Sequence, residues 1–486
     1  MQRSKTFCIK PWMHIATYTT GEALMCCVAK KTAGNLNQDK IQDIWNGDHY
    51  KQARLDMLAG RENPACVKCY SEEKAGIKSH RVVENHIWEI GTPSAIQPSV
   101  GKEFIDNLIS KTDSNGYLDS KPITFDFRLG NTCNLKCVMC GPKDSSQWVR
   151  FAEEMNVMPG GFTKRNPQIS KQEVKEMFDR LKKQFNWVED QALWDEQFIP
   201  LLSNVKHLII AGGEPLLLQQ HTRLLERCIA EGFSKNITIR YHTNGTVMSP
   251  KIIKLWEKFK AIDVCISMDS WGKKNEYIRY PGYWNDIMDN INMLEDTPDN
   301  IIPRIISTVN AYNVFYMPDF ANWLLEQNYK KLCRHNSSGK GVFTIAYVHG
   351  PSQLNCKVFP QKIKDKITRK YEDWYKDMWK DTSIYETRRI DWSSDRRADN
   401  DYDMYGNLPQ QVKPNIIDIR TPLNRRKDQA KDRLTDVYCI KDFMNSEDWS
   451  EHWDFFKSYT AKLDKVRGTN FKDTFPELSK LIDEEN

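Results

Sequence analysis

Three cysteines, Cys133, Cys137 and Cys140, lie within eight residues, directly after an apolar run at 123–129. Thiolates this close together in a short loop can bind one inorganic centre. Structural zinc normally has four protein ligands, whereas iron–sulfur clusters take cysteine thiolates. Three ligands on a four-iron cube leave one iron open for another molecule. The spacing favours an iron–sulfur cluster, with zinc or a chance grouping as the alternatives.

A second group of cysteines precedes this loop and contains Cys8, Cys26, Cys66 and Cys69. The Cys66–Cys69 pair has the spacing of a metal-binding knuckle, and Cys8 and Cys26 would complete a shell of four thiolates. Zinc and a second cluster both fit this set, and the sequence does not decide between Cys26 and the adjacent Cys27. A closed shell of this kind favours an electron carrier or a structural element.

Short β-branched or apolar runs alternate with helical patterns through the middle of the chain. The predicted strands are 123–129, 205–211, 237–243, 262–268, 303–309 and 342–348, and the helices between them are 217–231, 250–260, 284–295 and 317–330. This alternation predicts an α/β fold with a parallel sheet. Six strands are too few for a closed eight-stranded barrel, so we expect a partial barrel. Ligands gather at the carboxyl ends of such strands, where the three-cysteine loop lies.

The flanking regions differ in character from this core. We expect a cysteine-rich module at 1–80 with a helix around 41–59, a connector at 81–120, the core at 121–350 and a helical extension at 351–486. Residues 142–204 are too long for a simple connection and predict two or three helices. In the extension we expect helices near 361–380 and 447–465, with a polar, mobile stretch between them.

Composition excludes several classes of protein. The chain has 486 residues, 40% hydrophobic and 28% charged, with a net charge of +5. Both signs are interspersed, so we expect no dedicated nucleic-acid surface. No apolar run reaches the ~18 residues of a membrane span. The first residues lack a signal peptide's apolar region, and 13 cysteines suit a reducing compartment, so we expect a cytoplasmic protein.

The three-cysteine loop resembles the cluster motif of the radical S-adenosylmethionine (radical SAM) superfamily, because it has C-x3-C-x2-C spacing after a first strand. Three later segments resemble motifs of that family in the same order. Gly212-Gly213-Glu214-Pro215 resembles the GGEP motif, which holds the methionyl amino group; its alternative is a tight turn. The other two segments resemble the TNG and SxD motifs, which reach the ribose and the methionyl group, and their residues are Thr243, Asn244, Ser267 and Asp269.

The resemblance implies further contacts. The strand from Arg304 to Asn310 corresponds to the segment that packs on adenine, although it lacks the usual glycines. Arg279 or Arg304 would pair with the carboxylate of SAM, or either would form a surface ion pair. Strand alternation makes Asp126, Arg128 and Tyr347 inward-pointing candidates for substrate contact, with structural polar pairs as the alternative.

The N-terminal module resembles the SPASM or twitch module of radical SAM maturases, which carries auxiliary clusters. The similarity rests on C-x-x-P-W at 8–12, DIWNGDHYKQARLDMLAG at 43–60 and the knuckle at 66–69. Two features depart from that family: the module precedes the core, and its cysteines suffice for one cluster only. This number matches the shorter twitch form.

Taken together, the resemblance implies a radical SAM enzyme with a partial (β/α)6 barrel and two 4Fe–4S clusters. Such an enzyme cleaves SAM reductively to a 5′-deoxyadenosyl radical, which removes hydrogen from a substrate. Relatives with this module mostly oxidise or cross-link peptide or protein side chains, and a flavodoxin- or ferredoxin-type reductant would supply the electron. The alternatives are a small-molecule substrate, such as an aminoglycoside or nucleotide, and a zinc-stabilised binding module without chemistry.

Overall fold

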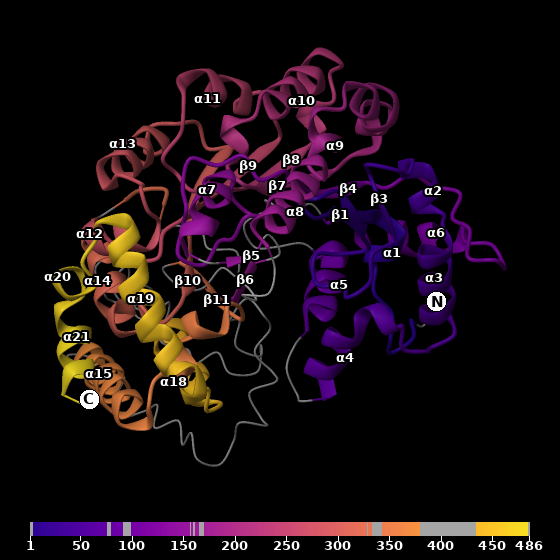
Figure 1. Ribbon diagram of the computed structural model, residues 1–486. Coiled ribbons are helices and arrows are strands. Elements are labelled where there is room, and N and C mark those ends of the chain that lie inside the picture. The colour runs from indigo at the N-terminus through magenta and orange to yellow at the C-terminus, as the bar shows by residue number, and fades with distance from the viewer. Residues whose placement is uncertain are drawn as a thin grey trace, which may run out of the picture.

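The computed structural model describes residues 3–74, 79–90, 99–155, 157–158, 161–164, 170–327, 329–332, 343–379 and 434–484 (Figure 1). Its main sheet is formed by β1 (His14–Thr17), β2 (Glu22–Leu24), β3 (Gly34–Asn35), β4 (Thr124–Leu129), β7 (His207–Gly212), β8 (Thr238–Thr243), β9 (Ala261–Ser267), β10 (Ile301–Val309) and β11 (Thr344–Tyr347). The strands follow the order β11-β10-β9-β8-β7-β4-β1-β2-β3.

Six of these strands, from β4 to β11, are parallel and coincide with the six predicted ones. In the described part of the chain the two end strands, β11 and β3, are not paired with each other. The sheet is therefore open, and the prediction of a partial α/β barrel is confirmed.

The helices between the parallel strands cover one side of the sheet. They are α10 (Gln219–Ala230), α11 (Pro250–Trp256), α12 (Gly272–Ile278), α13 (Trp284–Glu295) and α14 (Met317–Glu326). Four of them match the predicted helical stretches, and α12 is additional. Their apolar faces pack on strands such as HLIIAG and AIDVCIS, which are largely buried on both sides.

The long insertion covers the outer face of β4. It contains α7 (Ser146–Met155), the hairpin β5 (Val157–Met158) and β6 (Gly161–Lys164), α8 (Lys171–Lys183), α9 (Asn186–Glu189) and the helical turns η2 (Leu193–Phe198) and η3 (Ile199–Asn204). Phe127 of β4 lies edge-on to Phe198 of η2, with ring centroids 4.7 Å apart. The period-two pleat therefore directs Asp126 and Arg128 to the opposite, inner face. The expected helices are present, and the hairpin was not predicted.

The N-terminal module is joined to the barrel through the sheet itself. Strand β1 pairs in parallel with β4 and antiparallel with β2, which extends the sheet beyond the barrel's first strand. The helices of this module are α1 (Lys10–Met13), α2 (Ile41–Trp45), α3 (Asp48–Leu58), η1 (Pro64–Cys66), α4 (Val67–Lys74), α5 (His80–Ile90) and α6 (Gly101–Ser110).

One local expectation for this region needs correction. The predicted helix around 41–59 is broken at Asn46-Gly47 into α2 and α3. The break lets Arg54, which is fully buried, donate to the carbonyl oxygens of Trp45 and Pro11, both at 2.9 Å. The predicted connector at 81–120 holds α6 and most of α5, which begins at His80.

The C-terminal extension packs at the end of the sheet opposite the N-terminal module (Figure 1). It comprises α15 (Gln361–Trp379), α17 (Thr435–Tyr438), α18 (Ile440–Asn445), α19 (Trp453–Arg467), α20 (Phe471–Thr474) and α21 (Pro476–Asp483). Helices α15 and α19 match the two expected helices, whereas most of the polar stretch expected between them lies outside the described residues. Within the described part of the chain, no helix combines the length and apolarity needed to cross a membrane.

Candidate functional site

The three-cysteine loop leaves the carboxyl end of β4 and is held by its neighbours through backbone groups. The amides of Lys136 and Val138 donate to the carbonyl oxygens of Tyr280 and Ile278, at 2.7 and 2.8 Å. The indole N–H of Trp148 donates to the carbonyl oxygen of Cys137 at 2.9 Å. These bonds fix the loop's path through its backbone and do not involve its thiols.

The thiols themselves occupy a buried environment. Cys137 is buried, and Cys133 and Cys140 are half-buried. Burial raises the pKa of Cys133 to about 12. A hydrogen bond from the thiol of Cys140 lowers the pKa of Cys137. Thiolates in such a place need compensating positive charge, which a metal cluster provides.

The segment Gly212–Pro215 packs directly against this loop. The amide of Glu214 donates to the carbonyl oxygen of Thr132 at 2.7 Å. At Gly213 a Cβ atom would lie only 2.2 Å from that same oxygen, so only glycine allows this approach. Gly212 has a φ of +127°, which side chains disfavour. The two segments therefore pack together at the carboxyl ends of β4 and β7.

Glu214 is fully buried at the centre of this site. Its carboxylate accepts from the hydroxyl of Thr243 at 2.8 Å and from the amide of Asn244 at 2.7 Å. Burial nevertheless raises its pKa to about 7. The side-chain amide of Asn244 donates to Asn134 Oδ1 at 2.9 Å, inside the cysteine loop. Three of the predicted segments thus meet around one carboxylate.

The remaining predicted residues lie at two different heights along the parallel strands, either at their carboxyl ends or further inside the sheet. Ser267 is the last residue of β9, and the fully buried Asp269 follows two residues later. Arg279 Nε lies 2.9 Å from Asp269 Oδ2. Asp269, and after it the thiols of Cys137 and Cys140, raise the pKa of Arg279. Arg279 lies between Ile278 and Tyr280, whose carbonyl oxygens accept from amides of the cysteine loop.

Arg304 lies deeper, because it pairs in register with Cys265, two residues before the end of β9. Its Nε is 2.6 Å from Asp263 Oδ1, and its side chain is 1% exposed. The structure therefore brings Arg279, and not Arg304, to the edge where the cysteines lie. Asn310 is fully buried in the turn after β10, where it accepts from the amide of Tyr312 at 2.9 Å.

The candidate substrate contacts lie on or near the inner face of the sheet. Asp126 is 4% exposed, and its Oδ1 has no hydrogen-bond partner among the described residues. Burial raises its pKa. Arg128 is half-buried two residues further along β4. Tyr347 differs, because it stacks on Phe443 of α18 with centroids 3.8 Å apart.

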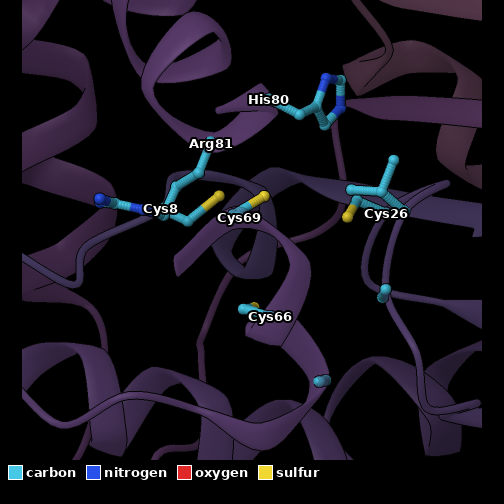
Figure 2. Close-up of a pocket in the computed structure, with 9 residues that line it drawn as sticks. Cys8, Cys26, Cys66, Cys69, His80 and Arg81 are labelled. Carbon is cyan, nitrogen blue, oxygen red and sulfur yellow. The ribbon is translucent and has the colours of Figure 1, made fainter. Parts of the chain in front are cut away.

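The second cysteine group surrounds a hollow in the N-terminal module. Its lining includes Cys8, Cys26, Cys66 and Cys69, together with Val28, Ala29, Ala65, His80 and Arg81 (Figure 2). The four predicted thiols, which are far apart in sequence, are thus brought together. In the part of the chain that the structure describes, no three His, Cys, Asp or Glu side chains converge as a single metal ion requires. The four thiols line a hollow and do not converge on a single position.

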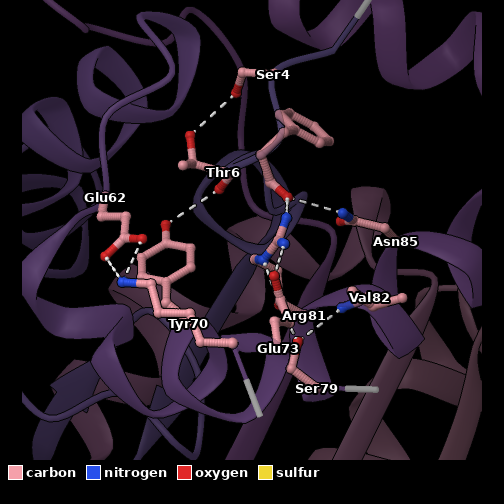
Figure 3. A network of polar contacts seen from close by, with 11 residues as sticks. Ser4, Thr6, Glu62, Tyr70, Glu73, Ser79, Arg81, Val82 and Asn85 are labelled. Carbon is pink, nitrogen blue, oxygen red and sulfur yellow. Dashed lines mark hydrogen bonds and ion pairs between the residues drawn. The ribbon is translucent and has the colours of Figure 1, made fainter. Parts of the chain in front are cut away.

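Polar contacts from α5 fix the Cys8 segment (Figure 3). Asn85 accepts from the amide of Ile9 at 2.8 Å and donates to the carbonyl oxygen of Phe7 at 2.9 Å, so it brackets Cys8. Arg81 donates to the same Phe7 oxygen and pairs with Glu73 of α4. At the knuckle, Asn63 caps η1 by accepting from the amide of Ala65 at 3.0 Å.

Cys27 is not among the residues that line this hollow, although it is adjacent to Cys26. Its Sγ lies 3.9 Å from Nε2 of His80, and Asp126 helps to raise its pKa. The structure therefore places Cys26 with the other three thiols. Sequence reasoning missed His80, Arg81 and Asn85, because nothing in their spacing relates them to the cysteines.

Comparison with known families agrees with this division. Residues 127–302 match the radical SAM superfamily, and residues 8–70 match the SPASM iron–sulfur cluster-binding domain. The two cysteine sites lie in separate matches, and the SPASM match precedes the other, as predicted. No curated protein matches the chain.

Solved structures with some similarity include anSMEcpe with bound AdoMet and Cp18Cys peptide, at 14% identity, with 52% of this chain and 60% of that chain covered and a TM-score of 0.32. Another is Streptococcus suis SuiB bound to precursor peptide SuiA, at 14% identity, with 68% and 63% covered and a TM-score of 0.32. This chain thus spans less than two thirds of the length of either structure.

Proposed function

We propose that this chain, which carries a radical SAM domain at 127–302 and a SPASM domain ahead of it, cleaves SAM reductively and removes hydrogen from a peptide or protein side chain. One observation carries the proposal: a three-thiol loop and a four-thiol hollow lie along one continuous sheet. A three-thiol shell leaves one coordination position open, whereas a four-thiol shell is closed.

The residues of the first site fit a cluster and SAM. Cys133, Cys137 and Cys140 would hold a 4Fe–4S cluster, and the fit is supported by the close approach at Gly213 and by the buried Glu214 carboxylate. When bound, the cluster and SAM supply a 5′-deoxyadenosyl radical. Glu214, Thr243, Asn244, Ser267, Asp269 and Arg279 are proposed to bind and orient SAM.

The residues of the second site fit an auxiliary cluster. Cys8, Cys26, Cys66 and Cys69 would close its shell, which would make it an electron carrier. The Asn85 and Arg81 contacts around Cys8 hold this shell in place. The link through β1 and β4 places Asp126 on the strand that joins the two sites, so we propose that Asp126 and Arg128 contact the substrate.

The experiment is anaerobic reconstitution followed by analysis of metal and products. We expect about eight irons and eight sulfides per chain, and 5′-deoxyadenosine on addition of dithionite and SAM. Cys137→Ala should abolish this product and keep about four irons. Cys228→Ala, which removes a buried thiol from α10 outside both sites, is the matched control. Zinc in place of iron, or product formation by Cys137→Ala, would overturn the proposal.

The substrate class has its own test. Peptides from cells grown on deuterated amino acids are incubated with the holoenzyme, dithionite and SAM, and a deuterated small-molecule extract is incubated in parallel. We expect deuterium in 5′-deoxyadenosine from the peptide pool only. Transfer from the small-molecule pool alone would instead favour the second candidate, a nucleotide or sugar substrate.

A further inference from the structure

We propose that Arg467 and Tyr459 of α19 position the three-cysteine loop and that the buried charge of Arg467 raises the reduction potential of the metal group bound there. This inference rests on the proposed function, because it needs a cluster at Cys133, Cys137 and Cys140. It assigns a role to the C-terminal extension, which lies outside the segments matched by either family.

The first observation concerns the hydrogen-bond donors that the loop's carbonyl groups find. Arg467 Nη2 donates to the carbonyl oxygen of Lys136, and Tyr459 Oη donates to that of Val138 at 3.3 Å. The carbonyl groups between and beside them are bound by Trp148 and Ser145. Helix α19 therefore holds two of the four consecutive carbonyl groups from Leu135 to Val138, which span the middle cysteine.

Arg467 also ties the loop to its other neighbour. Its Nη1 donates to the carbonyl oxygen of Tyr277 at 3.2 Å, and the hydroxyl of Tyr280 donates to the carbonyl oxygen of Arg467 at 3.3 Å. The segment 277–280 is the one that pairs with the amides of Lys136 and Val138. One guanidinium thus bridges the cysteine loop and the C-terminal end of α12 beside it.

The second observation is the charge of Arg467. The residue is 7% exposed, and in the described part of the chain it forms no ion pair with a carboxylate. Aromatic rings surround it, with Tyr280, Phe151 and Trp148 centroids at 5.1, 5.4 and 6.0 Å. A buried charge is costly unless an opposite charge lies nearby. The anionic group on the adjacent thiols is the counter-charge that this site offers.

The end of α19 is built to hold Arg467 in place. The helix ends at Arg467, and Gly468 follows with a φ of +66°, the left-handed conformation of a helix C-cap. Asp464 then accepts from the amide of Phe471 at 2.8 Å and from the hydroxyl of Thr469 at 2.7 Å. These contacts fix the turn, so the guanidinium enters the loop from a rigid helix end.

The physical consequence concerns the potential. Reduction adds negative charge to a cluster, so a fixed positive charge nearby stabilises the reduced form, and more strongly in a buried site. Removing the charge of Arg467 should therefore make the cluster harder to reduce. Removing only the Tyr459 hydrogen bond should loosen the loop without this electrostatic effect.

The test is a potentiometric titration followed by electron paramagnetic resonance on the full-length, anaerobically reconstituted protein. The signal of the three-cysteine site is identified by its change when SAM is added. For Arg467→Met we expect about a tenfold lower ratio of reduced to oxidised cluster at a given potential, which is about 59 mV for one electron. Arg467→Lys should restore most of the ratio, and Lys465→Met, on the exposed side of α19, should leave it unchanged.

A second measurement covers the case in which Arg467→Met binds no cluster. Hydrogen exchange of the loop amides in Tyr459→Phe should be faster than in the wild type, while exchange in β8 stays the same. An unchanged potential in Arg467→Met with full iron content, or unchanged exchange in Tyr459→Phe, would overturn the inference. A wild-type protein without a SAM-responsive signal would instead overturn the proposed function, and the inference with it.

Discussion

At Gly213, a Cβ atom would lie 2.2 Å from the Thr132 carbonyl oxygen, which shows how tightly two segments of the site are packed. The obstacle is backbone, which cannot rotate away as a side chain can. The amides of Gly213 and Glu214 bond to the same stretch of chain, at the carbonyl oxygens of Gly130 and Thr132. A side chain at this position would therefore separate Glu214 from the cysteine loop.

Gly213→Ala should consequently lower SAM cleavage by at least tenfold, measured as 5′-deoxyadenosine formed per cluster. The matched control is Gly350→Ala, because a Cβ at Gly350 meets nothing within 4 Å. Equal activity of the two variants would contradict the role assigned to the close approach.

His221 allows a prediction about pH at the same scale. It is fully buried on α10, its Nε2 lies 2.9 Å from the Tyr241 hydroxyl, and burial lowers its pKa to about 3. The unfolded chain binds this proton near pH 6.5, so the neutral ring stabilises the fold above that pH and the stabilisation is lost as the pH falls towards 3. The slope is about 1.4 kcal/mol per pH unit at most.

His221→Gln should therefore reduce the fall in unfolding free energy between pH 6 and pH 5 by about 1 kcal/mol, measured by urea denaturation. The control is His452→Gln, since the side chain of His452 is 36% exposed. If the unfolding free energy of both variants falls by the same amount between pH 6 and pH 5, His221 binds its proton in the folded protein as well.

At the scale of elements, the junction of β1 with β4 connects the module to the barrel. The fully buried Tyr50 of α3 contacts this junction. Its hydroxyl lies 2.8 Å from the carbonyl oxygen of His14 and 3.2 Å from that of Leu24. These carbonyl groups belong to β1 and β2. The side chain thus holds together the strands that attach the cysteine hollow to the sheet.

Tyr50→Phe should lower the unfolding free energy by about 1–2 kcal/mol, because buried carbonyl groups lose a donor. Tyr18→Phe, at a residue that is 39% exposed, should change it by a few tenths of a kcal/mol at most. Denaturant titration measures the unfolding free energy of both variants. An equal change in the two would exclude a stabilising role of the Tyr50 hydroxyl at the junction.

The elements also show what the sequence could and could not reveal. The six parallel strands were predictable because each is a short run rich in β-branched or apolar residues that alternates with a helical pattern. Strand β1 was not, because four residues, HIAT, carry too little periodicity and its partner lies 110 residues away. Among site residues, the cysteines have a diagnostic spacing. His80, Asn85 and Arg467 act through contacts that depend on the folded chain, so no local pattern identified them.

At the scale of the whole molecule, the sheet carries a cysteine site in each of two regions and ends on both sides in helical structure (Figure 1). The N-terminal module adds strands to the barrel edge, and the C-terminal extension reaches the cysteine loop through α19. The architecture thus separates the cluster-binding role that we propose for the four thiols of the hollow from the structural role of the strands beside them.

This separation predicts different outcomes for a point change and a deletion. The double variant Cys66→Ala/Cys69→Ala should lose about four irons and still form 5′-deoxyadenosine. Removal of residues 3–74 deletes β1 to β3 and exposes the edge of β4, so this protein should aggregate. Iron analysis and size-exclusion chromatography measure both. A soluble, monomeric deletion variant would show that β4 tolerates an open edge.

The pairing of β1 with β4 also sets an order for biosynthesis. Residues 14–17 leave the ribosome long before Thr124, their partner 110 positions later, has been translated. Until then β1 lacks the hydrogen bonds of the edge that pairs with β4. We therefore expect β1 to reach its final hydrogen-bonded place only after the first strand of the barrel has emerged.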